Sequence, residues 1–597
     1  MALSFLDQYF TFEAVLKILI RLRCKEAEKI QQHLVVDCIA VSNGRRMERP
    51  ESKRELYDMF PPRRQWVHLG MAARKDLTQA EKWQKSLWLT VMRERQREGR
   101  HSDWYTMLEE RIAHILIAAR TGKHIFDHPN VTVIEKKRNE QKKEIECRPI
   151  CLFKTIDERI IASLYNKALT ALFDPLFYEH SYAFRIFKEG DESMSHLNAV
   201  RKIKEFRAAH CGILWVAECD MKKFYDTIDH DVIKQRFMQL LLKQKQAGII
   251  SCEEFHILRR TMFSYIDCFS FHKHVFSFNR KPAHPIWKHI ENANGYKKVI
   301  KWIEEDIKEK RNGKWPYRTK LHDRYQLGVP QGGALSGLIA NVIMHFTDMR
   351  LKKYWQNDND FLYVRFCDDM IMMSSDKGKI DEATKCYTES IEKSHLYMHP
   401  DVPFTDRHMS KFWDGKTRLS YQWGEPAENV FPWITFVGYD YNWEGHTRIR
   451  KASVKKEIKK QYEKRIEIEH LLGAKGDRQP QWARQYIRNS VHKRMIGMSV
   501  GRVQMWNYTN FGNDYSWAKA FTQLTDNPWA RGQLKGLDRH RNLMMKRLWK
   551  FLLPLDYSAR KPSDRKANNK ALWYFGKPFS YYGQALKAWK PVMATQS

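Results

Sequence analysis

The sequence has few of the features that mark secreted or membrane proteins. It contains 10 cysteines in 597 residues, and no two of them form a C-x-x-C pair, which argues against a disulfide framework or a zinc ribbon. The first apolar stretch contains acidic residues and lacks a small-residue cleavage site. No apolar run reaches the roughly 18 residues of a membrane span. We therefore expect a cytoplasmic protein with free thiols, neither secreted nor inserted in a membrane.

Acidic residues are few in relation to basic ones. The chain has 104 Lys and Arg against 70 Asp and Glu, which gives a formal net charge of +34. An excess of this size indicates a polyanionic partner, with nucleic acid first and an acidic membrane surface second. Hydrophobic residues make up 43% and aromatic residues 13% of the chain, so it is globular rather than disordered.

The hydrophobic pattern changes along the chain. Residues 1–125 have mainly helical spacing, and 131–153 read as a hairpin of two strands with a lysine-rich tip. Residues 270–325 form a basic, aromatic stretch with the character of an insertion. From about 450 the pattern is helical and basic again, and it places Lys455 and Lys459 on one helical face.

Three segments carry the residues on which chemistry depends. In the first, which we call motif A (220–230), Asp220 and Met221 directly follow a strand-like apolar run. Motif B (328–337) has the sequence GVPQGGALSG, a glycine-rich turn that opens an apolar helix. Motif C (363–371) reads as strand, tight turn, strand, with Asp368 and Asp369 in the turn. Each piece alone is commonly an ordinary turn or helix cap, but the ordered combination is difficult to assemble by chance.

Two carboxylates on neighbouring strand ends can hold divalent cations. Mg²⁺ prefers carboxylate, phosphate and water oxygens, and a pair of metal ions stabilises both the attacking and the leaving oxygen of a phosphoryl transfer. Asp220 and Asp368 are the candidate ligands, with the carbonyl of Met221 as a possible backbone ligand and Asp369 in a peripheral catalytic role. Asp226 and Asp229 are expected to cap the following helix.

The three motifs resemble those of reverse transcriptases. D-x-K-x-F-[FY]-D-x-I-D-H, G-x-P-Q-G-G-x-L-S and [FY]-x-D-D are the A, B and C motifs of that family, and the match is closest to the bacterial group II intron, retron and defence-associated lineage. Segments 148–150, 157–159, 181–185 and 436–439 also resemble family motifs, so the likeness covers about 130–445. Phe366 replaces the usual tyrosine of motif C, and the long spacing between motifs A and B is consistent with an insertion at about 270–325.

The resemblance implies an α/β (α+β) right-hand polymerase. Fingers and a palm, an antiparallel sheet with helices, would occupy 126–445, and a basic helical thumb would occupy 446–550. Helical extensions would lie at 1–125 and 551–597, the latter rich in aromatic residues.

The resemblance also implies roles for individual residues. Tyr225 would exclude a ribose 2′-hydroxyl and so select dNTPs, while Arg148, Gln331 and Gly332 would bind the nucleotide. The residues expected near primer or template are Phe366, Cys367, Arg185, Phe436, Tyr439, Lys455 and Lys459; for Arg185 an alternative is that it orders the fingers. A lysine after motif C should protonate the leaving pyrophosphate, and the sequence does not choose among Lys393, Lys411 and Lys416.

The predicted function is RNA-directed DNA synthesis with dNTPs and two Mg²⁺ or Mn²⁺ ions. The lineage suggests bacterial anti-phage defence with a noncoding RNA, and a second polymerase or a homo-oligomer as further partners. Template-independent or protein-primed DNA synthesis by the same site is one alternative, and an RNA-dependent RNA polymerase is another. A catalytically silent nucleic-acid-binding scaffold is an alternative of a different class.

Overall fold

The computed structural model describes most of the chain. The described residues are 4–40, 51–74, 77, 79–186, 188–189, 192–270, 297–299, 327–354, 356, 358–402, 404, 409–473, 491, 495, 523–552 and 579–580. The chain divides into two compact units: unit 1 comprises 1–18 and 109–431, and unit 2 comprises 19–108 and 432–597. This division differs from the one drawn from sequence, because the N-terminal region 1–125 is shared between the two units.

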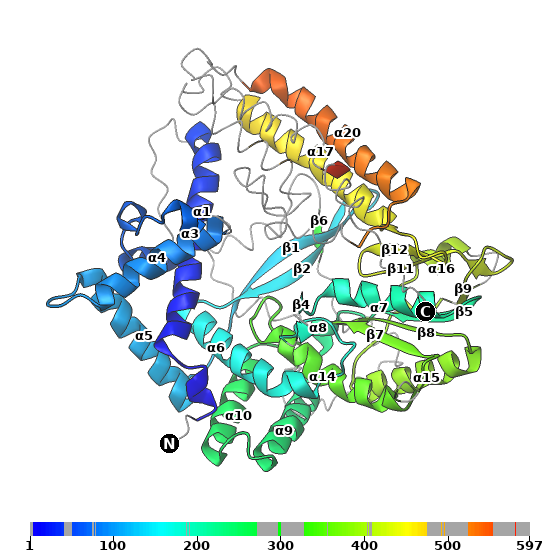
Figure 1. Ribbon diagram of the computed structural model, residues 1–597, viewed down its shortest axis with the longest axis horizontal. Helices are drawn as coiled ribbons and strands as arrows, with labels where there is room; N and C mark the ends of the chain where they lie inside the picture. The colour runs from blue at the N-terminus through cyan, green and yellow to red at the C-terminus, as the bar shows by residue number, and fades with distance from the viewer. Residues whose placement is uncertain are drawn as a thin grey trace. The chain divides into compact units, whose positions relative to one another are not determined.

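A five-stranded sheet lies in unit 1 (Figure 1). Its strand order is β10–β9–β5–β8–β7, with β5 at Leu214–Cys219, β7 at Leu362–Phe366, β8 at Asp369–Ser374, β9 at Arg418–Trp423 and β10 at Val430–Phe431. All neighbouring strands are antiparallel except the short β9–β10 pair. The nearly continuous burial of β5 and β8 is typical of strands covered on both faces. The predicted mixture of helices with an antiparallel sheet is therefore confirmed.

Helices cover this sheet and one another. The α-helices described in unit 1 beyond residue 125 are α6 (Ile156–Phe173), α7 (His196–Ala209), α8 (Phe224–Thr227), α9 (His230–Gln246), α10 (Cys252–Asp267), α14 (Ser336–Leu351), α15 (Lys377–Lys393) and α16 (Met409–Asp414). α15 packs on β5, β8 and β9, and α14 packs on α9 and α15. Capping boxes begin three of them: Thr155 with Glu158 at α6, Ser195 with Asn198 at α7, and Ser251 with Glu254 at α10. They satisfy backbone donors that the first turn leaves unpaired.

The predicted hairpin at 131–153 is confirmed. β1 (Asn130–Asn139) pairs antiparallel with β2 (Glu144–Leu152), and β6 (Lys297–Val299) adds a third strand parallel to β2. Lys143 has a φ of 47°, the left-handed conformation that a tight turn requires. A shorter hairpin joins β3 (Lys188–Glu189) to β4 (Glu192–Ser193).

Unit 2 combines N-terminal helices with C-terminal ones. α1 (Phe12–Ala40) and α5 (Asp103–Thr121) each extend across the boundary between the units, and α2 (Glu51–Asp58), α3 (Met71–Arg74) and α4 (Gln79–Arg95) lie within unit 2. The three-stranded sheet β11–β12–β13 spans Trp433–Phe436, Tyr439–Asn442 and Thr447–Ile449. It is followed by α17 (Lys451–Gly473) and α20 (Pro528–Leu548), which pack on each other.

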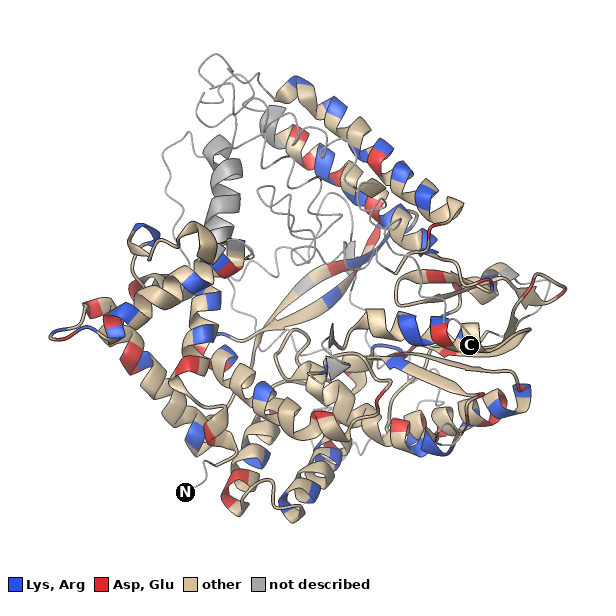
Figure 2. Cartoon of the chain, viewed as in Figure 1, with Lys and Arg blue, Asp and Glu red and all other residues tan. Residues whose placement is uncertain are grey.

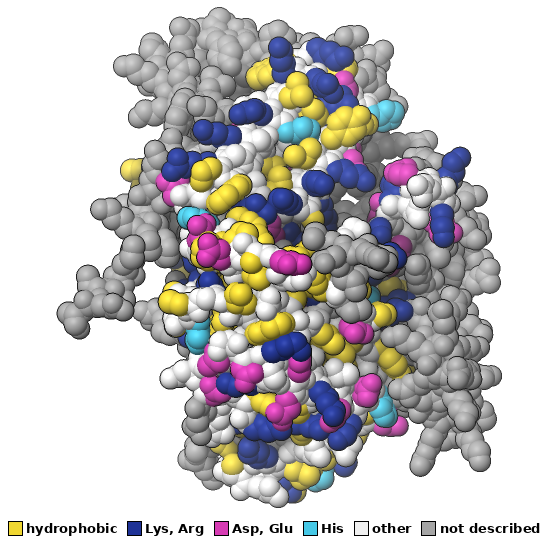
Figure 3. All heavy atoms as spheres, turned by 90° about the vertical axis from the view of Figure 1, so that its right-hand side faces the viewer, with side chains coloured by type: hydrophobic (Ala, Val, Ile, Leu, Met, Phe, Trp, Pro, Cys, Tyr) yellow, Lys and Arg dark blue, Asp and Glu magenta, His cyan; other side chains and the backbone are white. Residues whose placement is uncertain are grey.

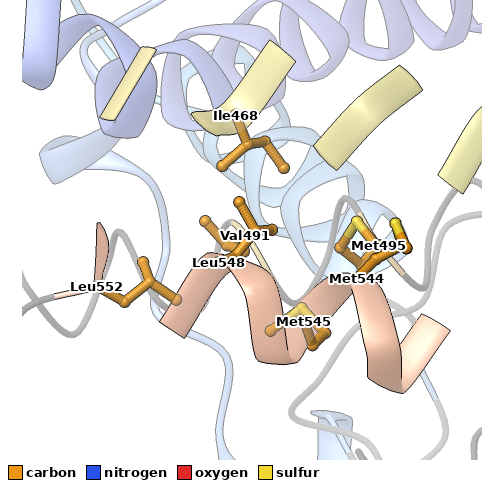
Figure 4. Packing of buried hydrophobic residues seen from close by; sticks show 7 residues of the cluster. All are labelled: Ile468, Val491, Met495, Met544, Met545, Leu548 and Leu552. Carbon is orange, nitrogen blue, oxygen red and sulfur yellow. The ribbon is translucent and has the colours of Figure 1, made fainter. Parts of the chain in front are cut away.

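The long helices α17 and α20 differ in the side chains that they bury. α20 buries a mainly apolar face, which is the amphipathic pattern expected of a surface helix, whereas α17 buries Glu457, Gln461 and Ile468. Figure 4 shows the buried cluster to which both contribute, formed by Ile468, Val491, Met495, Met544, Met545, Leu548 and Leu552. Bands of Lys and Arg run along both helices in Figure 2, and Figure 3 shows Lys and Arg side chains interspersed with apolar ones on that side of the molecule.

Some predictions fall outside the described residues. The proposed insertion at 270–325 is described only at Ser270 and in β6, and the proposed C-terminal extension at 551–597 only at 551–552 and 579–580. Among the helices that the structure describes, none combines the length and apolar character needed to cross a bilayer. Every cysteine whose side chain is described is a free thiol.

Candidate active site

The strand pairing in unit 1 brings motifs A and C to the same end of the sheet (Figure 1). Cys219, the last residue of β5, lies opposite Met370 of β8, so Asp220 emerges beside the β7–β8 turn. Cys367 has a φ of 61° in this turn, which lets β7 and β8 reverse direction within two residues. Asp220, Asp368 and Asp369, which we call the acidic centre, are therefore brought together from distant parts of the chain.

The carboxylates of the acidic centre repel one another. Burial raises the pKa of Asp368 above its usual value, and the charge of Asp220 raises it further. Burial together with the charges of Asp368 and Asp220 raises the pKa of Asp369 to about 7, although the residue itself reaches solvent. Like charges held this close require a cation to ionise fully.

One cation already contacts the acidic centre. The Lys416 Nζ lies 2.5 Å from the Asp220 Oδ2 and 3.2 Å from the His399 Nε2. The His399 backbone N–H donates to the Asp220 carbonyl at 2.9 Å, and Met398 pairs with Met221, which is buried. The segment 397–399 therefore lines the start of motif A.

The carboxylates of the acidic centre have donor atoms that suit a divalent metal ion. Within the described part of the chain, no three His, Cys, Asp or Glu side chains form a group that holds a metal by itself. Two carboxylates that repel each other, one of them already paired with an ammonium, nevertheless provide the hard, anionic oxygens that Mg²⁺ prefers, with phosphate and water left to complete its coordination.

The position of Lys416 follows from strand pairing. Glu218 on β5 lies opposite Arg418 on the antiparallel strand β9. Asp220, two residues after Glu218, therefore meets Lys416, two residues before Arg418. The buried Glu218 carboxylate accepts from the Arg418 guanidinium and the Tyr421 hydroxyl. Arg418 also donates to the Gly415 carbonyl at 2.7 Å, which fixes the loop just before Lys416.

A second, fully buried ion pair supports motif C. The Arg365 guanidinium donates to both carboxylate oxygens of Asp348, with Nη2–Oδ2 at 2.7 Å, and the side chains of both residues are 0% exposed. Arg365 also donates to the Cys367 carbonyl at 2.9 Å, and the Tyr363 hydroxyl donates to Asp348 at 2.8 Å. Although burial works against its charge, the carboxylate of Asp348 raises the pKa of Arg365.

Motifs A and B pair through their backbones. Gly328 and Val329 donate to the carbonyls of Ile228 and Tyr225 at 2.7 and 2.9 Å. The predicted cap at Asp229 is confirmed, because its carboxylate accepts from the first N–H groups of α9. The predicted cap at Asp226 was wrong: that carboxylate instead accepts from the Gln331 side-chain amide.

Asp226 lies near two of the residues expected at the nucleotide, Gln331 and Arg148. Burial raises the pKa of its carboxyl to about 6, against the opposing effects of Lys223, the Gln331 hydrogen bond and the nearby charge of Arg148. Arg148 itself is exposed on β2, opposite Ile134 of β1. The structure therefore places Gln331 and Arg148 in the same neighbourhood.

The glycines of motif B allow close approach of other segments. The Cys151 N–H donates to the Gln331 carbonyl at 2.8 Å, which attaches β2 to motif B. Gly332 has a φ of 94°, and a Cβ there would lie 3.3 Å from the Cys151 carbonyl. A Cβ at Gly333 would lie 1.9 Å from the Tyr265 hydroxyl, so only glycine fits at this position.

The residues expected at the primer or template differ in their surroundings. Phe366 is half-buried, 6.2 Å from the His196 ring centroid. Arg185 is buried and donates to Asp174, the Tyr178 carbonyl and the Ser181 carbonyl. These contacts are those of a residue that orders its own segment rather than one that faces nucleic acid.

The remaining primer and template candidates belong to unit 2. Phe436 and Tyr439 are paired residues next to the β11–β12 turn. They are 4% and 5% exposed, so both side chains are buried. Lys455 and Lys459 are exposed on α17, where they are available to a polyanion.

Comparison with known proteins identifies a segment of this chain as similar to reverse transcriptases. Residues 259–401 match the family described as "Reverse transcriptase (RNA-dependent DNA polymerase)"; this segment includes motifs B and C and begins after motif A. The "Putative COX1/OXI3 intron 1 protein" of Saccharomyces cerevisiae is 25% identical over 264 residues, which cover 42% of this chain and 27% of that protein. The chain thus matches about a quarter of the length of its curated relative.

Solved telomerase structures are also similar to this chain. Apo telomerase from Candida tropicalis matches with a TM-score of 0.36 and 12% identity over 90% of this chain and 85% of that one. A form truncated from the C-terminal domain matches with a TM-score of 0.32 and 14% identity over 54% of this chain and 55% of that one. The resemblance to reverse transcriptases noted from the motifs is confirmed to the extent of the family match.

Sequence reasoning missed the side chains that support the acidic centre. Arg365 lies within motif C and the others lie between or beside the motifs, and no local pattern indicates that they form these contacts: Asp348, Glu218, Arg418 and His399. A usable signal was present in β5, where Glu218 interrupts an otherwise apolar strand, because a buried acid normally requires a cationic partner.

Proposed function

We propose that this protein is an RNA-directed DNA polymerase that adds dNTPs to a 3′-hydroxyl. The observation that carries the proposal is the convergence of Asp220 and Asp368 at one sheet end, where each raises the pKa of neighbouring carboxyls. The family match over motifs B and C supports the same chemistry. A bound pair of Mg²⁺ or Mn²⁺ ions would stabilise the attacking and leaving oxygens of the transfer. Asp220, Asp368 and the carbonyl of Met221 would hold them, with Asp369 in support.

Three residues would bind the incoming nucleotide. The Arg148 guanidinium is exposed and can take the triphosphate bidentately. Gln331 and Gly332 attach to β2 and to Asp226, so the turn that would line the pocket is held on two sides. Tyr225 lies beside motif C, where its ring would block a ribose 2′-hydroxyl, the group that separates RNA from DNA precursors.

Lys416 is the lysine that the geometry favours as the general acid. Of the three lysines left open by the sequence, it is the one whose ammonium reaches a carboxylate of the acidic centre. Its ammonium neutralises Asp220 in this structure, and it would donate a proton to the departing pyrophosphate once substrate is bound. A positioned acid of this kind typically contributes about 10²- to 10⁴-fold to the rate.

The nucleic acid partners belong to the same proposal. An RNA template and a DNA primer would contact Phe366 and Cys367 near the acidic centre, with Lys455 and Lys459 of α17 following the phosphate backbone. Anti-phage defence with a noncoding RNA, and a second polymerase or further copy as partner, rests on the motif resemblance alone. Sequencing the RNA and new DNA that co-purify from the native host tests this part.

Primer extension tests the polymerase proposal directly. Purified protein is given an RNA template, a DNA primer, Mg²⁺ and each set of nucleotides in turn, dNTPs or rNTPs. We expect a complementary DNA product from dNTPs that disappears in the Asp368→Asn variant and persists in Asp103→Asn, a surface control. Complementary RNA from rNTPs would contradict the sugar assignment, and a biased product without template would indicate template-independent synthesis.

A further inference from the structure

A contact between motifs A and C joins the residue proposed to select the sugar to the acidic turn. The Tyr225 hydroxyl lies 3.2 Å from the Cys367 Sγ. The two residues are 142 positions apart in the sequence. The contact therefore ties the aromatic residue of motif A to the turn that carries the two aspartates of motif C.

The Tyr225 ring is held at two points. Its backbone carbonyl accepts from Val329 of motif B at 2.9 Å, which fixes the base of the side chain. Only the hydroxyl contact with Cys367 restrains the far end of the ring among the hydrogen bonds described for its side chain. Because a tyrosine ring turns about two torsions, losing that contact lets the ring move although its backbone stays in place.

Cys367 is well placed to act as a fixed support. Its φ of 61° belongs to the left-handed region, which a residue other than glycine keeps only when its surroundings impose it. Arg365, paired with the fully buried Asp348, donates to the Cys367 carbonyl at 2.9 Å. At 3.2 Å from the Tyr225 hydroxyl, the Cys367 thiol can serve as donor or acceptor toward it.

We infer that Cys367 is a positioning residue for sugar selection: its thiol holds the Tyr225 ring where the ring excludes a 2′-hydroxyl. This inference rests on the proposed polymerase function. It identifies Cys367 as the residue that supports the discrimination between dNTPs and rNTPs. Cys367 acts on sugar selection through Tyr225, so its substitution should change the ratio of dNTP to rNTP use. A change that is equal for both nucleotides would instead report the contact proposed between Cys367 and the primer or template.

The test compares kcat/KM for dATP and ATP in single-nucleotide extension by wild type, Cys367→Ala, Tyr225→Phe and the double variant. Loss of one hydrogen bond should lower the dATP/ATP ratio by about 3- to 10-fold in each single variant. The double variant should lose no more than either single one, because both remove the same contact. Cys367→Ser, which keeps a hydroxyl donor, should recover part of the ratio, and Cys386→Ala, a buried cysteine on α15, should match wild type.

Each outcome bears on a distinct statement. Equal losses for dATP and ATP in Cys367→Ala, or additive losses in the double variant, would overturn the role of Cys367 while leaving the polymerase intact. An unchanged ratio in Tyr225→Ala would overturn both the inference and the sugar selection proposed for Tyr225. Wild-type protein that extends with neither nucleotide would overturn the polymerase proposal itself. Melting temperatures of all variants identify any loss that comes from unfolding.

Discussion

Two ion pairs near motif C differ in almost every physical respect. Lys416 and Asp220 are 52% and 20% exposed, and their contact joins the loop between α16 and β9 to the residue that follows β5. Arg365 and Asp348 are 0% exposed, and further hydrogen bonds from Tyr363 and to Cys367 surround their contact. The first pair can exchange its cation for another at little cost, since water replaces what is lost. The second cannot separate without leaving a charge in a dry interior.

The difference shows that an ion pair between the same types of charged group can lie at a proposed reactive site or can stabilise the fold, depending on how far it is buried. The carboxylates that would receive metal and substrate in the proposed function are partly exposed to water and repel one another. The carboxylate that fixes the motif C turn is neutralised permanently. One substitution, Asp to Asn, should therefore have opposite consequences in the two regions.

The largest effect is expected on catalysis at the acidic centre. Asp368→Asn should lower dNTP incorporation by at least about 10³-fold, since metal-mediated charge stabilisation is worth several kcal/mol and each factor of ten corresponds to about 1.4 kcal/mol. The fold should be as stable as wild type or more so, because a repelling charge is removed. Quenched-flow primer extension and thermal melting measure the two quantities, and retained incorporation would refute the assignment of Asp368.

The next effect is on stability at the buried pair. Asp348→Asn leaves the Arg365 charge buried without its counter-ion, and it should cost about 3–5 kcal/mol of unfolding free energy. Glu389→Gln, in the exposed pair with Arg350, is the matched control and should cost less than about 1 kcal/mol. Urea denaturation of both variants decides the point: a similar small loss in each would mean that the buried pair contributes no more than the exposed one.

Substitution of Lys416 should lower the rate by a smaller factor and should raise the affinity for metal. Lys416→Met should slow incorporation by about 10²-fold through loss of the general acid. It should also tighten Mn²⁺ binding to the nucleotide-free protein, because the ammonium no longer competes for Asp220. Lys411→Met, on α16, is the control for a lysine on the same stretch. Slower chemistry with weaker Mn²⁺ binding would contradict the described contact.

The smallest effect is a pH dependence at Asp226. Its pKa is raised from 3.8 to about 6 by burial, so between these values the folded protein binds more protons than the unfolded chain and stability falls as pH rises. Between pH 4 and pH 7, the unfolding free energy of the Asp226→Asn variant should therefore decrease by about 1–3 kcal/mol less than that of wild type. Melting curves of metal-free wild type and variant across this range measure it, and parallel curves would exclude the shift.

The sequence predicted the parts of the site that are local. A strand that ends in an acid, a glycine-rich helix entry and a paired-acid turn each have a short pattern, so Asp220, Gln331 and Asp368 could be named and the antiparallel sheet expected. The hairpin of β1 and β2, with its polar tip between two apolar runs, was also predicted from the sequence.

The contacts that these residues make could not be predicted from the sequence, because they depend on the register in which strands pair and on tertiary packing. Lys416 meets Asp220 only because Glu218 pairs with Arg418, and three lysines were equally plausible before that pairing was known. The Asp226 carboxylate was expected at a helix cap and instead bonds Gln331, a contact that requires motifs A and B to lie side by side. The buried state of Arg185, Phe436 and Tyr439 likewise comes from tertiary packing that no short pattern encodes.

The most direct test is to locate the metal in the working complex. Crystals of the protein with an RNA template, a chain-terminated DNA primer, dNTP and Mn²⁺ allow the ions to be placed by anomalous scattering. We expect manganese within bonding distance of both Asp220 and Asp368, with the Lys416 ammonium displaced from Asp220. Manganese bound elsewhere, with Lys416 still paired to Asp220, would contradict the assignment of these two aspartates as the catalytic metal ligands.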